Sequence, residues 1–158
     1  MAKGMGNGFP IGWTAAAPEV AGSVQGATIS TFGGNPVASA AAKAVIDFIE
    51  EENLLANAAE TGAYLREALE ELQRRHRLIG DVRGMGLMQA IELVEDHKTK
   101  APAAQAALRL MEAARQNGLL IGKSGLYGNA IRVSPPLNIG KADVDEFARR
   151  LNAAFSSL

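Results

Sequence analysis

Residues 79–94, IGDVRGMGLMQAIELV, decide the fold that we expect for this chain. Three glycines, Gly80, Gly84 and Gly86, interrupt the first half of the stretch. The second half, residues 87–94, alternates Leu, Gln, Ile and Leu with Met, Ala, Glu and Val. A period of two residues is typical of a strand that buries one face. We therefore predict a strand at residues 87–94, with helical patterns on both sides of it in the sequence.

Two helices are predicted before this strand. Asn35 and Pro36 form a helix start, because Asn is a good N-cap and proline at the first helical position gives up no needed N–H group. One helix is expected to run from there to about Glu51, and a second from about Leu54 to Arg75, each with one apolar face. The residues expected on these buried faces are Val37, Ala41, Val45 and Phe48 in the first helix, and Ala58, Gly62, Leu65, Leu69 and Leu72 in the second.

Further elements follow the predicted strand. The patterns predict a helix at residues 102–116, short strands at 119–121 and 130–133, and a last helix at about 141–155. Residues 1 to 35 are rich in Gly, Pro, Ala, Thr and Ser and indicate loops, with an extended piece at 27–32. From residue 37 on, this order of helices and strands predicts an α/β domain in which helices cover a small sheet.

Composition narrows the classes of function. A chain of 158 residues that is 47% hydrophobic is one domain, or a domain and a fraction, with a real core. Its net charge of −1 favours neither a nucleic-acid nor an anionic-membrane partner. There is no cysteine and there are only two histidines, so we assign no metal-binding residues and expect neither a thiolate nor a histidine-rich metal centre, whereas a carboxylate site stays open. No apolar run approaches the roughly 20 residues that span a bilayer, and no secretory signal opens the chain, so a cytoplasmic protein is expected.

Two stretches near the start of the chain carry candidate functional residues. The first, MAKGMGNGFPIG, sets Lys3 among glycines, and on these residues alone it is either a solvated charge on loose backbone or a reactive amine. The second, STFGGNP at residues 30–36, places the hydroxyls of Ser30 and Thr31 and two glycines before a helix start. Because a helix N-terminus favours an anion, this stretch can bind phosphate, and the alternative is an ordinary turn and N-cap.

A third candidate, Arg132, lies in the short apolar stretch AIRVSPP at residues 130–136. A charge there needs a reason, and a guanidinium makes two parallel hydrogen bonds to a carboxylate. Arg132 could therefore hold a substrate carboxylate at a sheet edge, and the alternative is a structural ion pair or a surface arginine. Arg83, by contrast, is expected to be structural.

Taken together and in order, four motifs resemble the class III aminotransferases. These are pyridoxal-phosphate enzymes of fold type I, and they include 4-aminobutyrate, ornithine and alanine–glyoxylate aminotransferases. The motifs are AKGMGNGFPIG at residues 2–12, STFGGNP at 30–36, IGDVRGMGLM at 79–88 and IRVSPPL at 131–137. The resemblance covers essentially the whole chain and corresponds to the C-terminal part, well under half, of such an enzyme. It implies that residues 1–51 end the large cofactor-binding domain and that residues 52–158 are the small C-terminal α/β domain.

The resemblance also implies roles for the candidate residues. The lysine of the family's Ala-Lys-Gly motif forms the Schiff base with pyridoxal 5′-phosphate, which corresponds to Lys3. A primary amine suits this role, since it can hold an aldehyde and then move protons. The family's threonine in the second motif reaches the cofactor phosphate of the neighbouring subunit. This implies that Thr31, with Ser30 beside it, binds the cofactor in a homodimer with shared active sites. The family's arginine before the double proline binds a substrate carboxylate, which implies that role for Arg132.

The function implied by the resemblance is transfer of an amino group from an amine or amino acid to a 2-oxo acid, in two half-reactions. Two alternatives are a truncated fragment that folds or pairs without activity, and another pyridoxal-phosphate reaction such as racemisation or decarboxylation. In the family, the phosphate-cradling loop, the ring-stacking aromatic and the aspartate at the pyridine nitrogen lie upstream of the matched part. This sequence also departs from the family at Trp13, where a small residue is usual, and a bulky ring there could alter the loop after Lys3.

Overall fold

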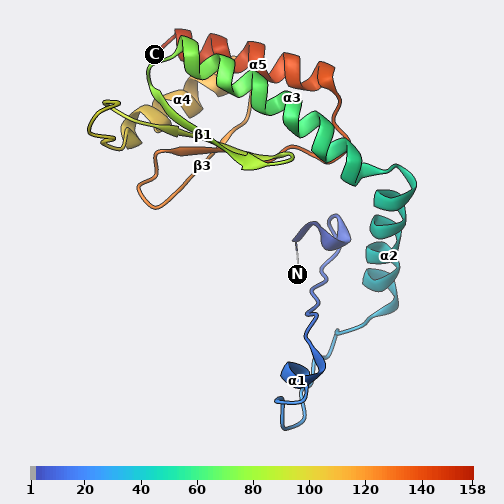
Figure 1. The fold of residues 1–158 in the computed structure, drawn as a ribbon. Helices are drawn as coiled ribbons and strands as arrows, with labels where there is room; N and C mark the ends of the chain where they lie inside the picture. Colours follow the sequence, from blue (N-terminus) through green and yellow to red (C-terminus); the bar gives the residue numbers. More distant parts are fainter. Residues whose placement is uncertain (1–2) are drawn as a thin grey trace. The chain divides into compact units, whose positions relative to one another are not determined.

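The computed structural model describes residues 3–158, and the chain divides into two compact units between Asn53 and Leu54. The first unit contains η1 (Lys3–Gly6), α1 (Pro18–Ala21) and α2 (Pro36–Glu51), joined by loops (Figure 1). The second contains α3 (Leu54–Arg75), β1 (Ile79–Met85), β2 (Met88–Leu93), α4 (Ala104–Gln116), β3 (Gly122–Ser124), β4 (Ala130–Val133) and α5 (Lys141–Ser156). The assignment of residues 1–51 and 52–158 to two domains of an aminotransferase stays a prediction.

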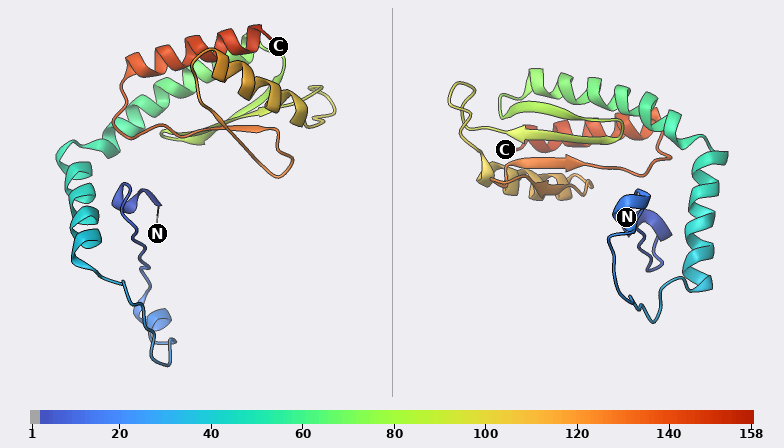
Figure 2. Two further views of the ribbon diagram at one scale, coloured as in Figure 1. Left: turned by 180° about the vertical axis from the view of Figure 1, so that it is seen from behind. Right: turned by 60° about the horizontal axis from the view of Figure 1, so that its bottom comes forward.

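The second unit is a four-stranded antiparallel sheet with its three helices packed on one face (Figure 1, Figure 2). The strand order is β1-β2-β4-β3. Ile91 of β2 pairs with Val82 of β1 and with Ile131 of β4, and all three lie in the core beneath the helices. Every second residue from Leu87 to Leu93 is buried, which confirms the alternation predicted from the sequence.

One continuous core joins the helices of this unit to the sheet. Its largest fully buried side chains are Leu65, Leu69, Ile79, Ile91, Leu93, Leu110, Ile131, Val144 and Leu151. They come from all three helices and from β1, β2 and β4, so a single hydrophobic layer holds the unit together. Full burial of one such side chain contributes roughly 1.5–3 kcal/mol. The apolar face predicted for α3 is confirmed, because most of its predicted members are buried in this layer.

Helix α3 approaches the β1–β2 hairpin closely at Gly62. A Cβ at that position would lie 2.3 Å from the carbonyl carbon of Gly86. One turn later, Arg66 donates from Nη1 to the carbonyl of Val82 at 2.5 Å and from Nη2 to the carbonyl of Gly84 at 2.9 Å. Gly62 thus lets α3 approach the hairpin turn at Gly86, and Arg66 takes up two backbone carbonyls of β1. Within β1, a Cβ at Gly84 would lie 2.1 Å from the carbonyl oxygen of Met88, so the glycine there allows a close approach to the neighbouring backbone.

Helix α2 begins where the sequence predicts. The Asn35 side chain accepts a hydrogen bond from the Ala38 N–H at 2.9 Å, and Pro36 occupies the first helical position. This cap satisfies one of the N–H groups that a helix start leaves without a partner.

The buried face predicted for α2 is wrong. Its buried residues are Ala38 and Ala42, whereas Val37 and Phe48 are 63% and 48% exposed. Within the first unit α2 packs against η1, and small alanine side chains let that backbone come close. The larger apolar residues point to sides of α2 that the described part of the unit leaves uncovered.

The extended piece predicted at residues 27–32 is not confirmed as a strand. No strand forms there in the described chain, and residues 31–34 are a turn. The Gly33 N–H bonds to the Ser30 carbonyl at 3.1 Å, which folds the segment back toward α2. An extended segment becomes a strand only when a neighbouring strand takes up its backbone hydrogen bonds.

The strand predicted at residues 119–121 lies three residues later, at β3. The Leu119 N–H still bonds to the Ala114 carbonyl of α4, at 2.8 Å, and Gly118 adopts a left-handed φ of 72°. The chain is therefore still closing the helix where the sequence suggests a strand. Pairing with β4 begins at Gly122, opposite Arg132.

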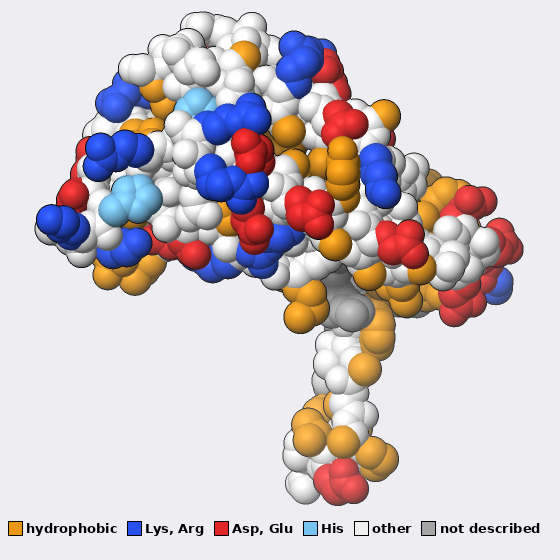
Figure 3. Space-filling view, turned by 45° about the horizontal axis from the view of Figure 1, so that its top comes forward, with side chains coloured by type: hydrophobic (Ala, Val, Ile, Leu, Met, Phe, Trp, Pro, Cys, Tyr) orange, Lys and Arg blue, Asp and Glu red, His pale blue; other side chains and the backbone are white. Residues whose placement is uncertain are grey.

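The outer surface of the helical layer carries interleaved basic and acidic side chains (Figure 3). On α5, for example, Glu146 bridges Arg149 and Arg150 at 2.7 and 2.6 Å. Such pairs are typical of a solvated helix face. None of the helices in residues 3–158 combines the length and the apolarity that crossing a membrane requires.

Candidate functional site

Lys3 opens the 3-10 turn η1, with an exposed side chain and a left-handed φ of 59°. Two hydrogen bonds fold the chain immediately after it. The Asn7 N–H bonds to the Gly4 carbonyl at 3.2 Å, and the Phe9 N–H bonds to the Gly6 carbonyl at 3.1 Å. Left-handed backbone is uncommon for a residue other than glycine, and such residues concentrate at functional sites. Lys3 therefore stands on a tightly folded turn.

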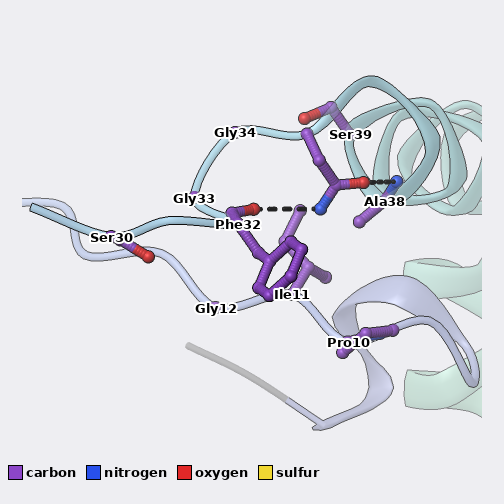
Figure 4. A pocket seen from close by; sticks show the side chains of 10 residues that line it. Pro10, Ile11, Gly12, Ser30, Phe32, Gly33, Gly34, Ala38 and Ser39 are labelled. Atoms are coloured by element: carbon purple, nitrogen blue, oxygen red, sulfur yellow. Dashed lines mark hydrogen bonds between the residues drawn. The ribbon is translucent and has the colours of Figure 1, made fainter.

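The loop after this turn lines a hollow in the first unit. Figure 4 shows side chains that line it. Its volume is about 240 Å³. Residues 10–12 form one wall, residues 30 and 32–35 form another, and Ala38 and Ser39 of α2 close it. The glycine at position 6 allows Ile11 to pack closely against the turn, because a Cβ on Gly6 would lie 2.9 Å from Cγ2 of Ile11. The hollow thus joins the loop that follows Lys3 to the turn that precedes α2.

Two hydrogen bonds of the Asn35 side chain hold the turn before α2, and Figure 4 marks them where they end at Phe32 and Ala38. Its Oδ1 accepts from the Ala38 N–H at 2.9 Å, and its Nδ2 donates to the Phe32 carbonyl at 3.0 Å. A Cβ at Gly34 would meet nothing within 4 Å, so the backbone there is open to a ligand. The first turn of α2 carries no acidic residue that would repel an anion at this helix end. The turn can therefore accept a phosphate group.

Ser30 and Thr31, the predicted cofactor-binding residues, both lie in this turn. Ser30 lines the hollow, whereas Thr31 is exposed and is not among the lining residues. Within residues 3–158, neither hydroxyl has a hydrogen-bond partner. Both groups are thus available to a ligand that reaches the turn.

Arg132 lies in β4, on the face of the sheet opposite the helices. It stands between Ala90 of β2 and Gly122 of β3. Its side chain is exposed, and no carboxylate within residues 3–158 forms an ion pair with it. It lines a second hollow, of about 320 Å³, together with Ser134 and Phe147. This guanidinium is therefore available to bind a carboxylate from outside the unit.

Arg83 lies across Ala90 from Arg132 and has a different environment. Its Nη1 contacts Asp81 at 2.7 Å and Glu92 at 2.5 Å. Hydrogen bonds to these carboxylates, first to Asp81, raise the pKa of Arg83 above its ordinary value. Arg83 thus has the structural ion pair that the sequence suggests for it.

The predicted site residues divide between the two units. Lys3, Ser30 and Thr31 belong to the first unit, and Arg132 belongs to the second. The structure brings Ser30 to the same hollow as the loop after Lys3, and the roles of all four residues stay predictions. The sequence does not single out Ile11 as a lining residue, because only the structure shows that Ile11 packs against Gly6 and reaches the hollow. Across residues 3–158, no three His, Asp or Glu side chains gather as a metal ion would need.

Comparison with known protein sequences identifies several relatives. The family model described as aminotransferase class-III matches residues 1–155. The mitochondrial alanine–glyoxylate aminotransferase 2 homolog 2 of Arabidopsis thaliana is 45% identical over 159 residues, covering 100% of this chain and 33% of that protein. Ethanolamine-phosphate phospho-lyase homolog 1 of Caenorhabditis elegans is 37% identical over 155 residues, covering 96% and 33%.

Comparison with solved structures also identifies a transaminase. The PLP-bound form of an amine transaminase from an uncultivated Pseudomonas species matches with a TM-score of 0.74 at 41% identity. The match covers 81% of this chain and 29% of that chain. The predicted fold class, part of a fold type I α/β enzyme, is confirmed. The chain spans about a third of the length of the curated relatives that it matches.

Proposed function

The chain belongs to the class-III aminotransferase family, and from this membership we propose that it is the C-terminal part of a pyridoxal-phosphate aminotransferase. The reaction is transfer of an amino group from an amine or amino acid to a 2-oxo acid. The observation that carries the proposal is the family match over residues 1–155. That span holds the lysine turn, the phosphate-compatible turn before α2 and the arginine of β4 in one chain.

Pyridoxal 5′-phosphate is the proposed cofactor, and the PLP-bound amine transaminase that this chain resembles supports it. The first unit fits the phosphate group of this cofactor. Its turn offers two hydroxyls without partners in the described chain, open backbone at Gly34 and a helix end free of acidic residues. Ser30 and Thr31 would hold the phosphate of the cofactor bound to a partner subunit, and Lys3 would hold the aldehyde of the cofactor bound to its own subunit. When bound, the cofactor supplies that aldehyde and an electron-withdrawing ring.

Lys3 carries the chemistry in this proposal. Its Nζ is a primary amine, which can attach to an aldehyde and be displaced by an incoming amino donor. Once displaced, the same Nζ would take a proton from the α-carbon of the donor and would deliver a proton to the former aldehyde carbon of the cofactor, so that the nitrogen can leave the donor. The folded turn η1 limits where this amine can go, which favours proton transfer over a short distance.

Arg132 is proposed to bind a carboxylate of the amino acid or 2-oxo acid. Its exposure, the hollow beside it and the lack of a carboxylate partner within residues 3–158 support this role. A guanidinium that makes two parallel hydrogen bonds fixes the orientation of a carboxylate as well as its position. Arg132 would therefore favour substrates that carry an acid group.

We also propose a homodimer with shared active sites. Val37, Ile46 and Phe48 of α2 are exposed within the chain, and exposed apolar residues on one helix support burial in an assembly. In the dimer, Ser30 and Thr31 would face the cofactor bound by the partner subunit. Sedimentation of the holoenzyme tests this, since a fully active monomer would contradict shared sites.

Borohydride reduction tests the assignment of Lys3. In the holoenzyme that contains this sequence, reduction should fix the cofactor to Lys3, as read by peptide mass spectrometry. The other lysines of the chain serve as internal controls, and they are Lys43, Lys98, Lys100, Lys123 and Lys141. Lys3→Arg keeps the positive charge and should abolish the label. A cofactor found on another lysine would refute the assignment.

An inert fragment is the alternative from another class of function. Adding pyridoxal 5′-phosphate to this same chain distinguishes the two. A new cofactor absorbance band, together with the circular dichroism of a folded protein, supports cofactor binding. A folded spectrum without a new band favours a piece that folds or pairs without chemistry.

A different pyridoxal-phosphate reaction is a second candidate. The 37% identity to a protein named ethanolamine-phosphate phospho-lyase homolog 1 favours it. A phospho-lyase releases phosphate, whereas transamination moves nitrogen from an amine to a 2-oxo acid. The holoenzyme is incubated with a nitrogen-labelled donor and a 2-oxo acid, and separately with phosphoethanolamine. Label in the new amino acid supports transamination, and free phosphate supports the lyase.

A further inference from the structure

Trp13 ties the end of the lysine loop back onto its beginning. Its indole Nε1–H donates to the Sδ of Met5 at 3.0 Å. Met5 lies two residues after Lys3 in the turn η1 and is partly buried. Trp13 is 42% exposed, so its ring lies on this loop at the surface of the unit. Thioethers make favourable contacts with aromatic rings, which adds to the N–H···S bond.

A second contact between the two ends of this loop, residues 5–6 and residues 11–13, supports this closure. Gly6, next to Met5, packs against Ile11, with 2.9 Å between a Cβ built on Gly6 and Cγ2 of Ile11. The tip between them is formed by Asn7 and Gly8, both with positive φ, at 44° and 108°. Met5 is thus held against Trp13, and Gly6 is held against Ile11. A loop closed at its base samples fewer conformations than an open one.

The backbone of Lys3 needs such a restraint. Its φ of 59° is unfavourable for a residue with a Cβ and persists only where the surroundings enforce it. The Lys3 side chain is exposed, so its own packing supplies little of that restraint. Among the described residues, two contacts of η1 can supply this restraint. The turn packs against α2, and its Met5 accepts the hydrogen bond from Trp13.

We propose that Trp13 is a positioning residue for Lys3. Its hydrogen bond to Met5 holds η1 in the conformation that presents the Lys3 Nζ to an aldehyde. The inference rests on the proposed role of Lys3 as the amine that takes the cofactor. Without the bond, the turn spends time in other conformations, and the apparent affinity of Lys3 for the aldehyde falls by the lost fraction.

Two conservative variants remove the bond from opposite sides. Trp13→Phe keeps an aromatic ring and removes the N–H donor, and Met5→Leu keeps the volume and removes the sulfur acceptor. The apoenzyme that contains this sequence is titrated with pyridoxal 5′-phosphate, reduced with borohydride and digested. Mass spectrometry then gives the concentration that half-saturates Lys3, which is a readout independent of turnover.

The expected result is a rise in that concentration of about fivefold for each single variant, the effect of one hydrogen bond on an equilibrium constant. The double variant should also show about fivefold, because both changes remove the same bond. Unchanged values in the single variants would overturn the proposal. A double variant that multiplies the two single effects would overturn it as well, since Trp13 and Met5 would then act separately.

Val24→Ala is the matched control. Val24 is an apolar residue of the same unit, 65% exposed, and its truncation should leave the half-saturating concentration unchanged. Thermal unfolding is followed in parallel, and a fall in Tm large enough to explain the lost label would assign Trp13 to general stability instead. If the unmodified enzyme shows no saturable label at Lys3, the proposed role of Lys3 fails, and this outcome is distinct from failure of the positioning role.

Discussion

Two arginines on the same face of the sheet differ in what surrounds their guanidinium groups. Arg83 is held by Asp81 and Glu92, which come from its own strand and from the next. Arg132 has Ala90 and Gly122 beside it across the strands, and neither can neutralise a charge. An exposed arginine beside small residues can turn toward a ligand. The neighbours in the sheet, and not the residue type, therefore separate an arginine held by carboxylates from one whose guanidinium has no carboxylate partner within residues 3–158.

At this scale, the substitution Arg132→Lys should weaken binding of a carboxylate substrate. Lysine keeps the charge but loses the planar fork, so we expect KM for the 2-oxo acid to rise roughly tenfold to a hundredfold, with a smaller change in kcat. Steady-state kinetics of the holoenzyme measures both. Arg109→Lys, on the exposed side of α4, is the control and should change neither. An unchanged KM in Arg132→Lys would remove Arg132 from the substrate site.

Gly62 lies where helix α3 and the β1–β2 hairpin approach each other closely. A Cβ at this position would meet the carbonyl carbon of Gly86 at 2.3 Å, and backbone atoms cannot move aside cheaply. Gly62→Ala should therefore lower the free energy of unfolding by about 2 kcal/mol, although alanine is the better helix former. Urea denaturation measures this. Gly122→Ala, where a Cβ would meet nothing within 4 Å, should cost much less. Equal effects at both positions would contradict the close approach.

Among the elements, α2 and α3 show why helix faces are predicted with different success. Both begin and end where the sequence predicts. The apolar stripe of α3 is buried because a sheet lies beneath it, whereas α2 meets η1 and loops through its alanines. A periodic pattern says that a helix has an apolar face, but the packing partner decides how much of that face is covered.

Helix α5 gives a prediction about pH. Hydrogen bonds from Arg149 and then Arg150 lower the pKa of Glu146 from 4.5 to about 2. A carboxyl group with a lowered pKa in the folded state adds stability above about pH 4.5, and that stability is lost as the pH falls toward 2. Glu146→Gln should therefore lower Tm slightly at pH 7, and the difference from the unmodified chain should vanish near pH 2. The effect is small because the pair is exposed.

Thermal melts between pH 2 and pH 7 measure this difference. Glu60→Gln, an exposed residue of α3, is the control and should show no such pH dependence. A constant difference for Glu146→Gln across the whole range would mean that its contacts are not ionic.

The two units of the molecule differ in how much hydrophobic core each contains. The hydrophobic core lies entirely within residues 58–155, and the buried residues in the described part of the first unit are Gly6, Ala38 and Ala42. We therefore expect a fragment of residues 54–158 to unfold cooperatively on its own, at a temperature close to that of the main transition of the intact chain. Circular dichroism melts measure both. A gradual, non-cooperative melt of the fragment would contradict this view.

The sequence alone determined the family motifs, most helix limits and the alternation along β2. The reason is that capping, proline placement and periodicity act between residues a few positions apart. The start of α2 at Asn35 and Pro36 is such a case, because the cap contacts a residue only three positions away. The candidates Lys3, Ser30, Thr31 and Arg132 also come from the sequence, since each stands in a short motif.

Only the tertiary structure decided which of these residues have partners and which are covered. It placed the start of β3 at Gly122, buried Ala38 in place of Phe48 and set Trp13 against Met5. Within residues 3–158 it paired Arg83, and not Arg132, with carboxylates. All of these depend on backbone segments that approach one another in space. A local sequence pattern indicates that a residue can pack or form an ion pair. Which residue it contacts depends on how distant parts of the chain fold together.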